Sequence, residues 1–306
     1  YIKIWKKFST KVPTGVGFLI IIFFFFYYSN EYLYFINIFL IFIFSLIYYL
    51  DDLIEIHFLW RILLQILASL VVCIFYIIDF NLKLIFLTMS TFLILVNTLN
   101  FQDGEDLNLA TLLIIIFGIF YFYTENNFTQ NISEVILLYL ISFSLFNLKK
   151  ENLYFGDSGC YVISIIILLL INEESHNTTL IKSLIVVIIY PSIDLFYVVI
   201  YRILKKDNIF SRNYLHIYQI TANKINSKVY LLPCILFSIL NFFISSHFYL
   251  GMNLIIFLVT LNIILLFVTR LLLNKLPNYY EKQENLYCWI WTSCRKYYYS
   301  IFKYWY

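Results

Sequence analysis

Long apolar runs, separated by short polar stretches, constrain this chain more than any other feature of its sequence. The 306 residues are 62% hydrophobic and 13% charged, with a mean hydropathy of +0.83. Soluble domains carry about 25% charged residues, and a soluble fold of this size would leave too much apolar surface in water. The sequence therefore predicts an all-α, polytopic integral membrane protein.

Each membrane-spanning helix needs about 20 apolar residues, and the runs predict about ten such helices. An eleventh before Tyr1 is left open. The predicted spans lie at residues 16–29, 32–50, 59–78, 82–98, 109–123, 133–148, 160–171, 179–201, 229–248 and 251–273. We expect a single transmembrane domain over residues 1–273 and a C-terminal tail over 274–306. Loops at 51–58, 99–108, 149–159 and 202–228 all return to one side of the membrane.

Basic residues collect on the side of the membrane that carries these loops. Only Lys83 and Lys182 fall on the opposite side in this topology. Positive charge gathers on the cytoplasmic side of membrane proteins, so the sequence predicts an inner or plasma membrane protein whose loops face the cytoplasm. The formal net charge is only +3, and no nucleic-acid partner is expected.

The first polar stretch of interest is "YYLDDLIEIHFLWRILLQ". Asp51 and Asp52 end an apolar run, and adjacent carboxylates at a membrane boundary repel each other. Such a pair favours a bound cation or a reacting proton; a charged stop at a helix end is the alternative. Further along, Arg61 and Gln65 are spaced so that they share one helix face.

The second stretch, "NTLNFQDGEDLNLA", carries two amides and two carboxylates at regular spacing. On a helix they would lie on or near one face, which suits a polar ligand. Gly104 would break that helix or let another group approach. A plain polar loop is the alternative. The four polar residues are Asn97, Asn100, Asp103 and Asp106.

The third stretch, "YFGDSGCY", places Asp157 between Gly156 and Gly159 in an apolar region. Glycines allow a tight turn with free amides, which suits phosphate. One carboxylate beside such a turn suits Mg²⁺, which keeps few protein ligands and often bridges substrate phosphates. Taken alone, this pattern is equally explained by turn chemistry.

Two more stretches are polar on the same side. In "YPSIDLFYVVIYRILKKDNIFSRNYLHIYQI", a proline would kink the span, Asp194 follows it, and the most basic loop of the chain comes next. This loop contains Arg202, Arg212 and a lone histidine, His216. It would hold phosphates, or it is an ordinary positive-inside loop. The stretch "KVPTGVGFL", which includes Lys11, precedes the first span.

Together, the five stretches and their order resemble the polyprenyl-phosphate N-acetylhexosamine-1-phosphate transferases, glycosyltransferase family 4. The resemblance covers residues 11–219. "PTGVG" is similar to that family's P-x-x-G-G, "LDDLIEI" with the later R and Q to its D-D motif, and "NTLNFQDGEDLNLA" to N-x-x-N-x-x-D-G-x-D-G-L-A. "YFGDSGCYVIS" is similar to F-x-G-D-x-G-S, and "PSIDLFYVVIYR" to P-x-x-D followed by an arginine. The branch looks closer to the initiators of O-antigen and teichoic-acid linkage synthesis than to the peptidoglycan enzyme.

The sequence departs from the family pattern at three places. Leu107 stands where D-G-x-D-G has its second glycine, and Cys160 replaces a serine. The family's H-x-H motif is reduced to His216, with Tyr218 or Tyr214 at the position of the other histidine, depending on the register. These departures leave open a family member that binds its substrates without catalysis.

The resemblance implies that a UDP-N-acetylhexosamine, such as UDP-GlcNAc, gives its sugar-1-phosphate to polyprenyl (undecaprenyl) phosphate and releases UMP. This reaction starts the synthesis of lipid-linked cell-envelope glycans. The implied cofactor is Mg²⁺, with Mn²⁺ as an alternative, and a homodimer is possible. An ion-coupled transporter is the rival function, since acids inside membranes often mark ion paths. It predicts acids in mid-span, whereas these lie at span ends, with Asp194 as the near exception.

The resemblance also implies roles for individual residues. Asp157 and Asp52 would hold the metal, and either Asp51 or Asp52 would hold the lipid phosphate or take its proton. Tyr154 would stack on uracil next to Gly156. The remaining residues of the nucleotide site would be Asn97, Asn100, Asp103 and Asp106. Catalytic or phosphate contacts would come from His216, Arg202, Arg212 and Lys11.

Overall fold

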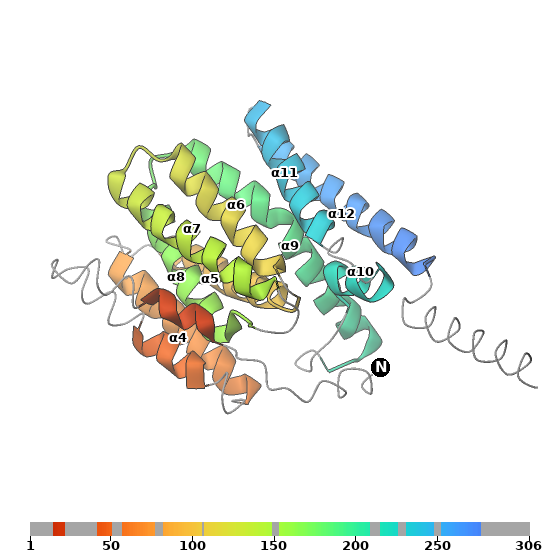
Figure 1. Ribbon diagram of the computed structural model, residues 1–306, viewed down its shortest axis with the longest axis horizontal. Helices are drawn as coiled ribbons and strands as arrows, with labels where there is room; N and C mark the ends of the chain where they lie inside the picture. The colour runs from red at the N-terminus through yellow and green to blue at the C-terminus, as the bar shows by residue number, and fades with distance from the viewer. Residues whose placement is uncertain are drawn as a thin grey trace, which may run out of the picture.

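The structure is a computed structural model that describes residues 15–21, 42–50, 57–76, 82–105, 107–148, 153–208, 215–225, 231–247 and 252–276. All regular elements within these ranges are helical (Figure 1). In chain order they are η1 (Val16–Leu19), α4 (Phe58–Tyr76), α5 (Leu82–Gln102), α6 (Asn108–Tyr123), α7 (Asn127–Asn147), α8 (Gly156–Glu173), α9 (Thr178–Lys205), α10 (Ile217–Ile225), α11 (Leu231–His247) and α12 (Met252–Asn274).

Each predicted span from residue 59 onward coincides with one helix, and the described part of the chain is that of a helical membrane protein. Among the described residues, five helices are long and apolar enough to cross a membrane, namely α5, α7, α8, α9 and α12. Shorter apolar helices lie at Leu59–Val71, Asn108–Tyr123 and Pro233–Ile244. A helix is the expected form, because it satisfies every backbone polar group within the segment. The total of about ten spans stays a prediction.

The helices reach further than the hydropathy of the sequence suggested. α5 continues to Gln102 and α8 already begins at Gly156, so "GDSG" is the first turn of a helix rather than part of a loop. Inside the predicted loop 202–228, α9 continues to Lys205 and α10 forms a helix of its own. Polar residues near helix ends lower the hydropathy while the backbone remains helical, which explains the differences.

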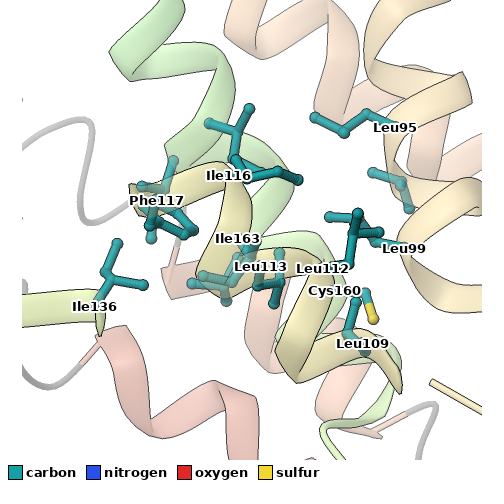
Figure 2. Close-up of a cluster of buried hydrophobic side chains, with 14 of the residues drawn as sticks. Leu95, Leu99, Leu109, Leu112, Leu113, Ile116, Phe117, Ile136, Cys160 and Ile163 are labelled. Carbon is teal, nitrogen blue, oxygen red and sulfur yellow. The ribbon is translucent and has the colours of Figure 1, made fainter. Parts of the chain in front are cut away.

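The core lies where α5, α6, α7 and α8 meet. Figure 2 shows Leu95 and Leu99 of α5 near Leu112 of α6 and Cys160 of α8. α8 is the central helix: 78% of its apolar stretch is buried, against 17% for α12. Cys160 is fully buried. The replacement of a family serine by cysteine therefore falls in the apolar core, where a small hydrophobic side chain packs well.

Large apolar side chains cover the outer faces of the peripheral helices. Examples are Ile264 and Phe267 on α12 and Trp60 on α4, with 59%, 54% and 61% of their surface exposed. A water-soluble protein rarely exposes so much continuous apolar surface. These faces suit a lipid environment.

The two ends of α8 differ in character. At its C-terminal end, the Thr124 hydroxyl donates to the buried Glu174 carboxylate, and Asn177 Nδ2 donates to the Tyr123 carbonyl at 2.9 Å. These bonds join the chain just after α6 to the connection between α8 and α9, and they satisfy polar groups there. Asp103 and Asp157, from two of the polar stretches singled out by the sequence, lie at the opposite, N-terminal end of α8.

Candidate functional site

Asp103 holds the N-terminal end of the central helix α8. It lies in the turn after α5, and its carboxylate accepts a bond from the Gly156 amide at 2.8 Å and one from the Phe155 amide at 3.3 Å. The first amides of a helix have no partner within the helix, and its N-terminus carries partial positive charge. A carboxylate on this end therefore fixes the start of α8, where Asp157 stands in the first turn.

Asp157 faces a cation from a neighbouring helix. Arg61 Nη1 of α4 lies 3.5 Å from Asp157 Oδ2, and the two side chains are 37% and 24% exposed. An ion pair with this exposure contributes only about 0–1 kcal/mol to stability. Such a pair adds little to the fold, and its partly exposed charges can rearrange around a charged ligand at low cost.

The same face of α4 reaches α5. Gln65 lies one helical turn after Arg61 on α4. Its Oε1 accepts a bond of 3.2 Å from Asn97 Nδ2 of α5. The helical residues 42–50 join this group, because the Tyr48 hydroxyl donates to the Arg61 carbonyl and the Tyr48 ring stacks on Tyr161 of α8. The chain just before Asp51 therefore packs next to α8, the helix that carries Asp157 in its first turn.

Two glycines let η1 touch α8 backbone to backbone. The Gly17 amide donates to the Phe155 carbonyl at 3.0 Å. A Cβ on Gly17 would lie 2.4 Å from the Cα of Gly159, and a Cβ on Gly159 would lie 2.5 Å from the Phe155 ring. The segment that resembles P-x-x-G-G thus packs directly on the segment that resembles F-x-G-D-x-G-S.

Asn147, the last residue of α7, ties together the two loops of the site. Its Oδ1 accepts a bond from the Leu107 amide, and its Nδ2 donates to the Leu153 carbonyl. Leu107 has φ 64°, the left-handed conformation that glycine adopts without strain. The leucine at the family's glycine position keeps the backbone conformation of glycine, and Asn147 helps to hold it.

Replacing Asn147 by leucine, which is of similar size, should lower the free energy of unfolding by about 1–3 kcal/mol. The reason is that the partly buried Leu107 amide and Leu153 carbonyl would both lose their partner. Thermal unfolding in detergent measures the effect. Asn147→Asp is the matched variant, since it keeps the acceptor for Leu107 and removes the donor to Leu153. Its free energy of unfolding should lie between that of wild type and that of Asn147→Leu. Wild-type stability in Asn147→Leu would contradict the role given to this side chain.

The helix α10 packs on the turn that carries Asp103. The Tyr218 hydroxyl donates to the Phe101 carbonyl, and a Cβ on Gly104 would lie only 2.2 Å from that hydroxyl. Burial, and next to it the negative charge of Glu105, raises the pKa of Tyr218 well above its usual value. Tyr218 therefore remains a neutral donor, and Gly104, in the turn just after α5, allows its close approach.

Behind α10 lies a buried group of charged side chains. Asp194 of α9 is only 2% exposed, and its carboxylate accepts bonds from His216 Nδ1 at 3.0 Å and from Arg270 Nη2 at 2.8 Å. The Ile217 amide adds a third bond at 3.3 Å. Three donors around one buried carboxylate compensate for most of the solvation it has lost.

The structure treats the predicted site residues differently. Asp103, Gly156, Asp157 and Asn97 belong to the group at the N-terminal end of α8. Asn97 and Asn100 both lie on α5, but this helix ends at Gln102. Asp103 therefore follows the helix and does not continue the helix face that we expected. Tyr154 is half-buried in the loop before α8. Asp51, Asp52, Asp106, Arg212 and Lys11 lie outside the described residues.

Two predicted contact residues are buried. His216 is 1% exposed and binds Asp194, while Arg202 is 4% exposed and donates to the Asn208 carbonyl. Both side chains are engaged by protein groups, and their contacts with a ligand stay a prediction.

Three residues that lie in or next to the candidate site were missing from the sequence-based site, namely Arg61, Arg270 and Asn147. Arg61 had a signal, because it follows the acidic pair in the order that the family shows. Arg270 had a weaker one, since an arginine within an apolar helix usually marks a function, yet it was attributed to topology. Asn147 had none: an amide at the end of an apolar run is ordinary, and only packing reveals its two partners.

The family model described as Glycosyl transferase family 4 matches residues 32–173. This range includes Arg61, Asn97, Asp103 and Asp157 and ends at the last residue of α8. No curated protein matches the chain.

Proposed function

Because the chain belongs to glycosyl transferase family 4 through residues 32–173, we propose that it transfers N-acetylhexosamine-1-phosphate from a UDP-sugar to polyprenyl phosphate and releases UMP. Membership supports a phospho-sugar transferase. The observation that carries the finer proposal is the pair of bonds from the Phe155 and Gly156 amides to Asp103, which fix Asp157 at the start of the central helix.

The position of this site suits the two substrates. One is held in the membrane by its polyprenyl chain, and the other is dissolved in water, so they must meet at the interface. The site lies at the end of an apolar bundle, where helices of spanning length begin and end. The excess of basic residues on this side of the chain favours the cytoplasmic face of the plasma or inner membrane.

Attack of one phosphate on another requires neutralisation of charge and accurate positioning. Arg61 supplies a permanent positive charge 3.5 Å from Asp157. Asp103 accepts bonds from the backbone just before Asp157 and so holds it in place. Asn97 and Gln65 provide neutral donors and acceptors next to them. These groups suit the orientation of a diphosphate and a sugar.

The donor set at Asp157 fits Mg²⁺. No three His, Cys, Asp or Glu side chains gather within the described ranges, but Mg²⁺ commonly takes one or two carboxylates and completes its shell with water and substrate phosphates. Asp157 would hold it, with Asp52 as the second candidate and Mn²⁺ as the alternative metal. When bound, the metal would neutralise negative charge on the diphosphate.

The chain's own residues complete the proposal. Asp51 or Asp52 accepts the proton of the lipid phosphate or holds the phosphate in place. Tyr154 and Asn100 contact the uracil and ribose side of the nucleotide, together with Asp106. Asp103, His216 and Arg202 act by positioning, because they are bonded to protein groups. Lys11 and Arg212 remain candidates for phosphate contacts.

The test is UMP release by the purified protein in detergent, with undecaprenyl phosphate and UDP-GlcNAc. We expect release that requires the lipid and is abolished by a chelator of divalent cations. Other UDP-N-acetylhexosamines then rank the sugar. Binding of UDP-sugar without UMP release would indicate a family member that has lost catalysis. No release and no binding would contradict the proposal, and ion flux in liposomes would then test the transporter.

A further inference from the structure

A largely buried arginine, Arg270, lies outside the segment that matches the family and pairs with Asp194. Arg270 stands near the end of α12, a mostly exposed helix. Its Nη2 donates to Asp194 Oδ1 at 2.8 Å and to the Leu215 carbonyl at 2.8 Å. Its guanidinium carbon lies 4.1 Å from the centre of the Tyr197 ring. One side chain thus contacts α9 and the backbone just before α10.

Asp194 and Arg270 together fix the start of α10. Asp194 accepts bonds from the His216 ring and from the Ile217 amide, while Arg270 holds the Leu215 carbonyl. Three consecutive residues are therefore attached to one buried ion pair. Removal of one member of such a pair leaves an unpaired buried charge, which is far more costly than loss of a surface pair. The start of α10 has little freedom while both partners are present.

From α10, the contacts continue to the candidate site. Tyr218 donates to the Phe101 carbonyl, and its hydroxyl rests against Gly104. Asp103 lies in this turn, just before Gly104, and its carboxylate accepts bonds from the amides of Phe155 and Gly156. A shift of α10 would therefore move the turn that fixes the start of α8.

We propose that Arg270 is a positioning residue for the transferase site, which it affects through Asp194, α10 and the turn at Phe101–Gly104. It touches no reacting group. Its effect on catalysis rests on the proposed function, whereas its effect on the turn does not. The sugar-nucleotide site is the one concerned, since this turn carries Asp103 and precedes Asp106.

A purely structural role for Arg270 would be to attach α12 to the bundle. The chain offers a matched control for this, because Asn262 of α12 and Asn241 of α11 exchange side-chain bonds of 2.8 and 3.2 Å. Asn262→Leu weakens the attachment of α12 but leaves Asp194 and its three donors in place. A variant at Asn262 should therefore lower stability without altering the site.

The experiment compares Arg270→Gln, Arg270→Lys and Asn262→Leu with wild type. We expect Arg270→Gln to lower kcat/KM for UDP-GlcNAc by about 10–100-fold, mainly through KM, since small displacements of binding groups have effects of this size. Arg270→Lys, which keeps the charge, should recover part of the loss. Asn262→Leu should keep the wild-type KM. An unchanged KM in Arg270→Gln, or an equal rise in Asn262→Leu, would overturn the inference.

Hydrogen exchange separates this inference from the proposed function. In Arg270→Gln, amides of residues 101–105 and 217–225 should exchange faster than in wild type and in Asn262→Leu, whether or not the protein releases UMP. If Arg270→Gln does not fold, Tyr218→Phe tests the same contacts, because it removes the bond from α10 to the Phe101 carbonyl and leaves the ion pair in place. This variant should raise KM and speed amide exchange at residues 101–105. Unchanged exchange in the variant that folds would overturn the inference, while absence of UMP release by wild type would overturn only the function.

Discussion

Asp157→Asn should lower the rate of UMP release by about 10²–10³-fold, a loss typical for removal of a group that stabilises developing charge. The carboxylate is partly exposed at the first turn of α8 and is the described candidate for holding Mg²⁺. Asparagine has the same shape, but it carries no charge and binds a hard cation weakly. The measurement is initial rates at saturating UDP-GlcNAc and undecaprenyl phosphate over a range of Mg²⁺ concentrations.

Asp207→Asn is the matched control for this substitution. Asp207 is exposed just after α9, and its removal deletes the same charge from the same side of the chain. It should leave the rate within about twofold, because exposed charges interact weakly through water and salt. Wild-type activity in Asp157→Asn would exclude the proposed metal ligand. An equal loss in both variants would point to overall charge instead.

Gly159→Ala should separate η1 from α8 and lower the free energy of unfolding by about 1–3 kcal/mol or more. The added Cβ would lie 2.5 Å from the Phe155 ring and 2.7 Å from the Cα of Gly17. Backbone atoms cannot give way as a flexible side chain can, and the Gly17 amide is bonded to the Phe155 carbonyl. Thermal unfolding in detergent and UMP release should both fall, because Phe155 precedes Gly156 and Asp157.

Gly17→Ala tests the same contact from the other side, where the Cβ would lie 2.4 Å from the Cα of Gly159. Gly118→Ala is the control, since a Cβ at Gly118, within α6, meets no heavy atom within 4 Å. Alanine is preferred over glycine inside a helix by about 0.5–1 kcal/mol, so this variant should be as stable as wild type or more so. Comparable losses in all three variants would show that the effect comes from alanine itself.

Helix positions were the most predictable part of this chain. The spans expected at 59–78, 82–98 and 179–201 correspond to α4, α5 and α9, with differences at the ends. An apolar run of this length has one way to satisfy its backbone in a membrane, and that way is local. The order of the polar stretches was equally readable, and it indicated the family before the comparison did.

The partners of the polar residues were less predictable. Sequence reasoning named His216 as a catalytic residue and counted Arg270 only for topology, whereas the structure places both side chains against the Asp194 carboxylate. It also expected the polar residues from Asn97 onward to share one helix face, but α5 ends at Gln102. These partners share one property: spacing along the chain says nothing about residues that approach from another helix.

The sequence by itself determined the class of this protein, a bundle of apolar helices with polar stretches of a recognisable family pattern. Those features depend on local properties, namely the length of apolar runs and the residue types between them. Only the tertiary structure decided that Asp103 holds the start of α8, that Gly17 meets Gly159, and that Arg270 pairs with Asp194. Each of these contacts joins segments far apart in the chain, and each depends on how whole helices pack, because close approach and burial of charge are properties of the assembled bundle.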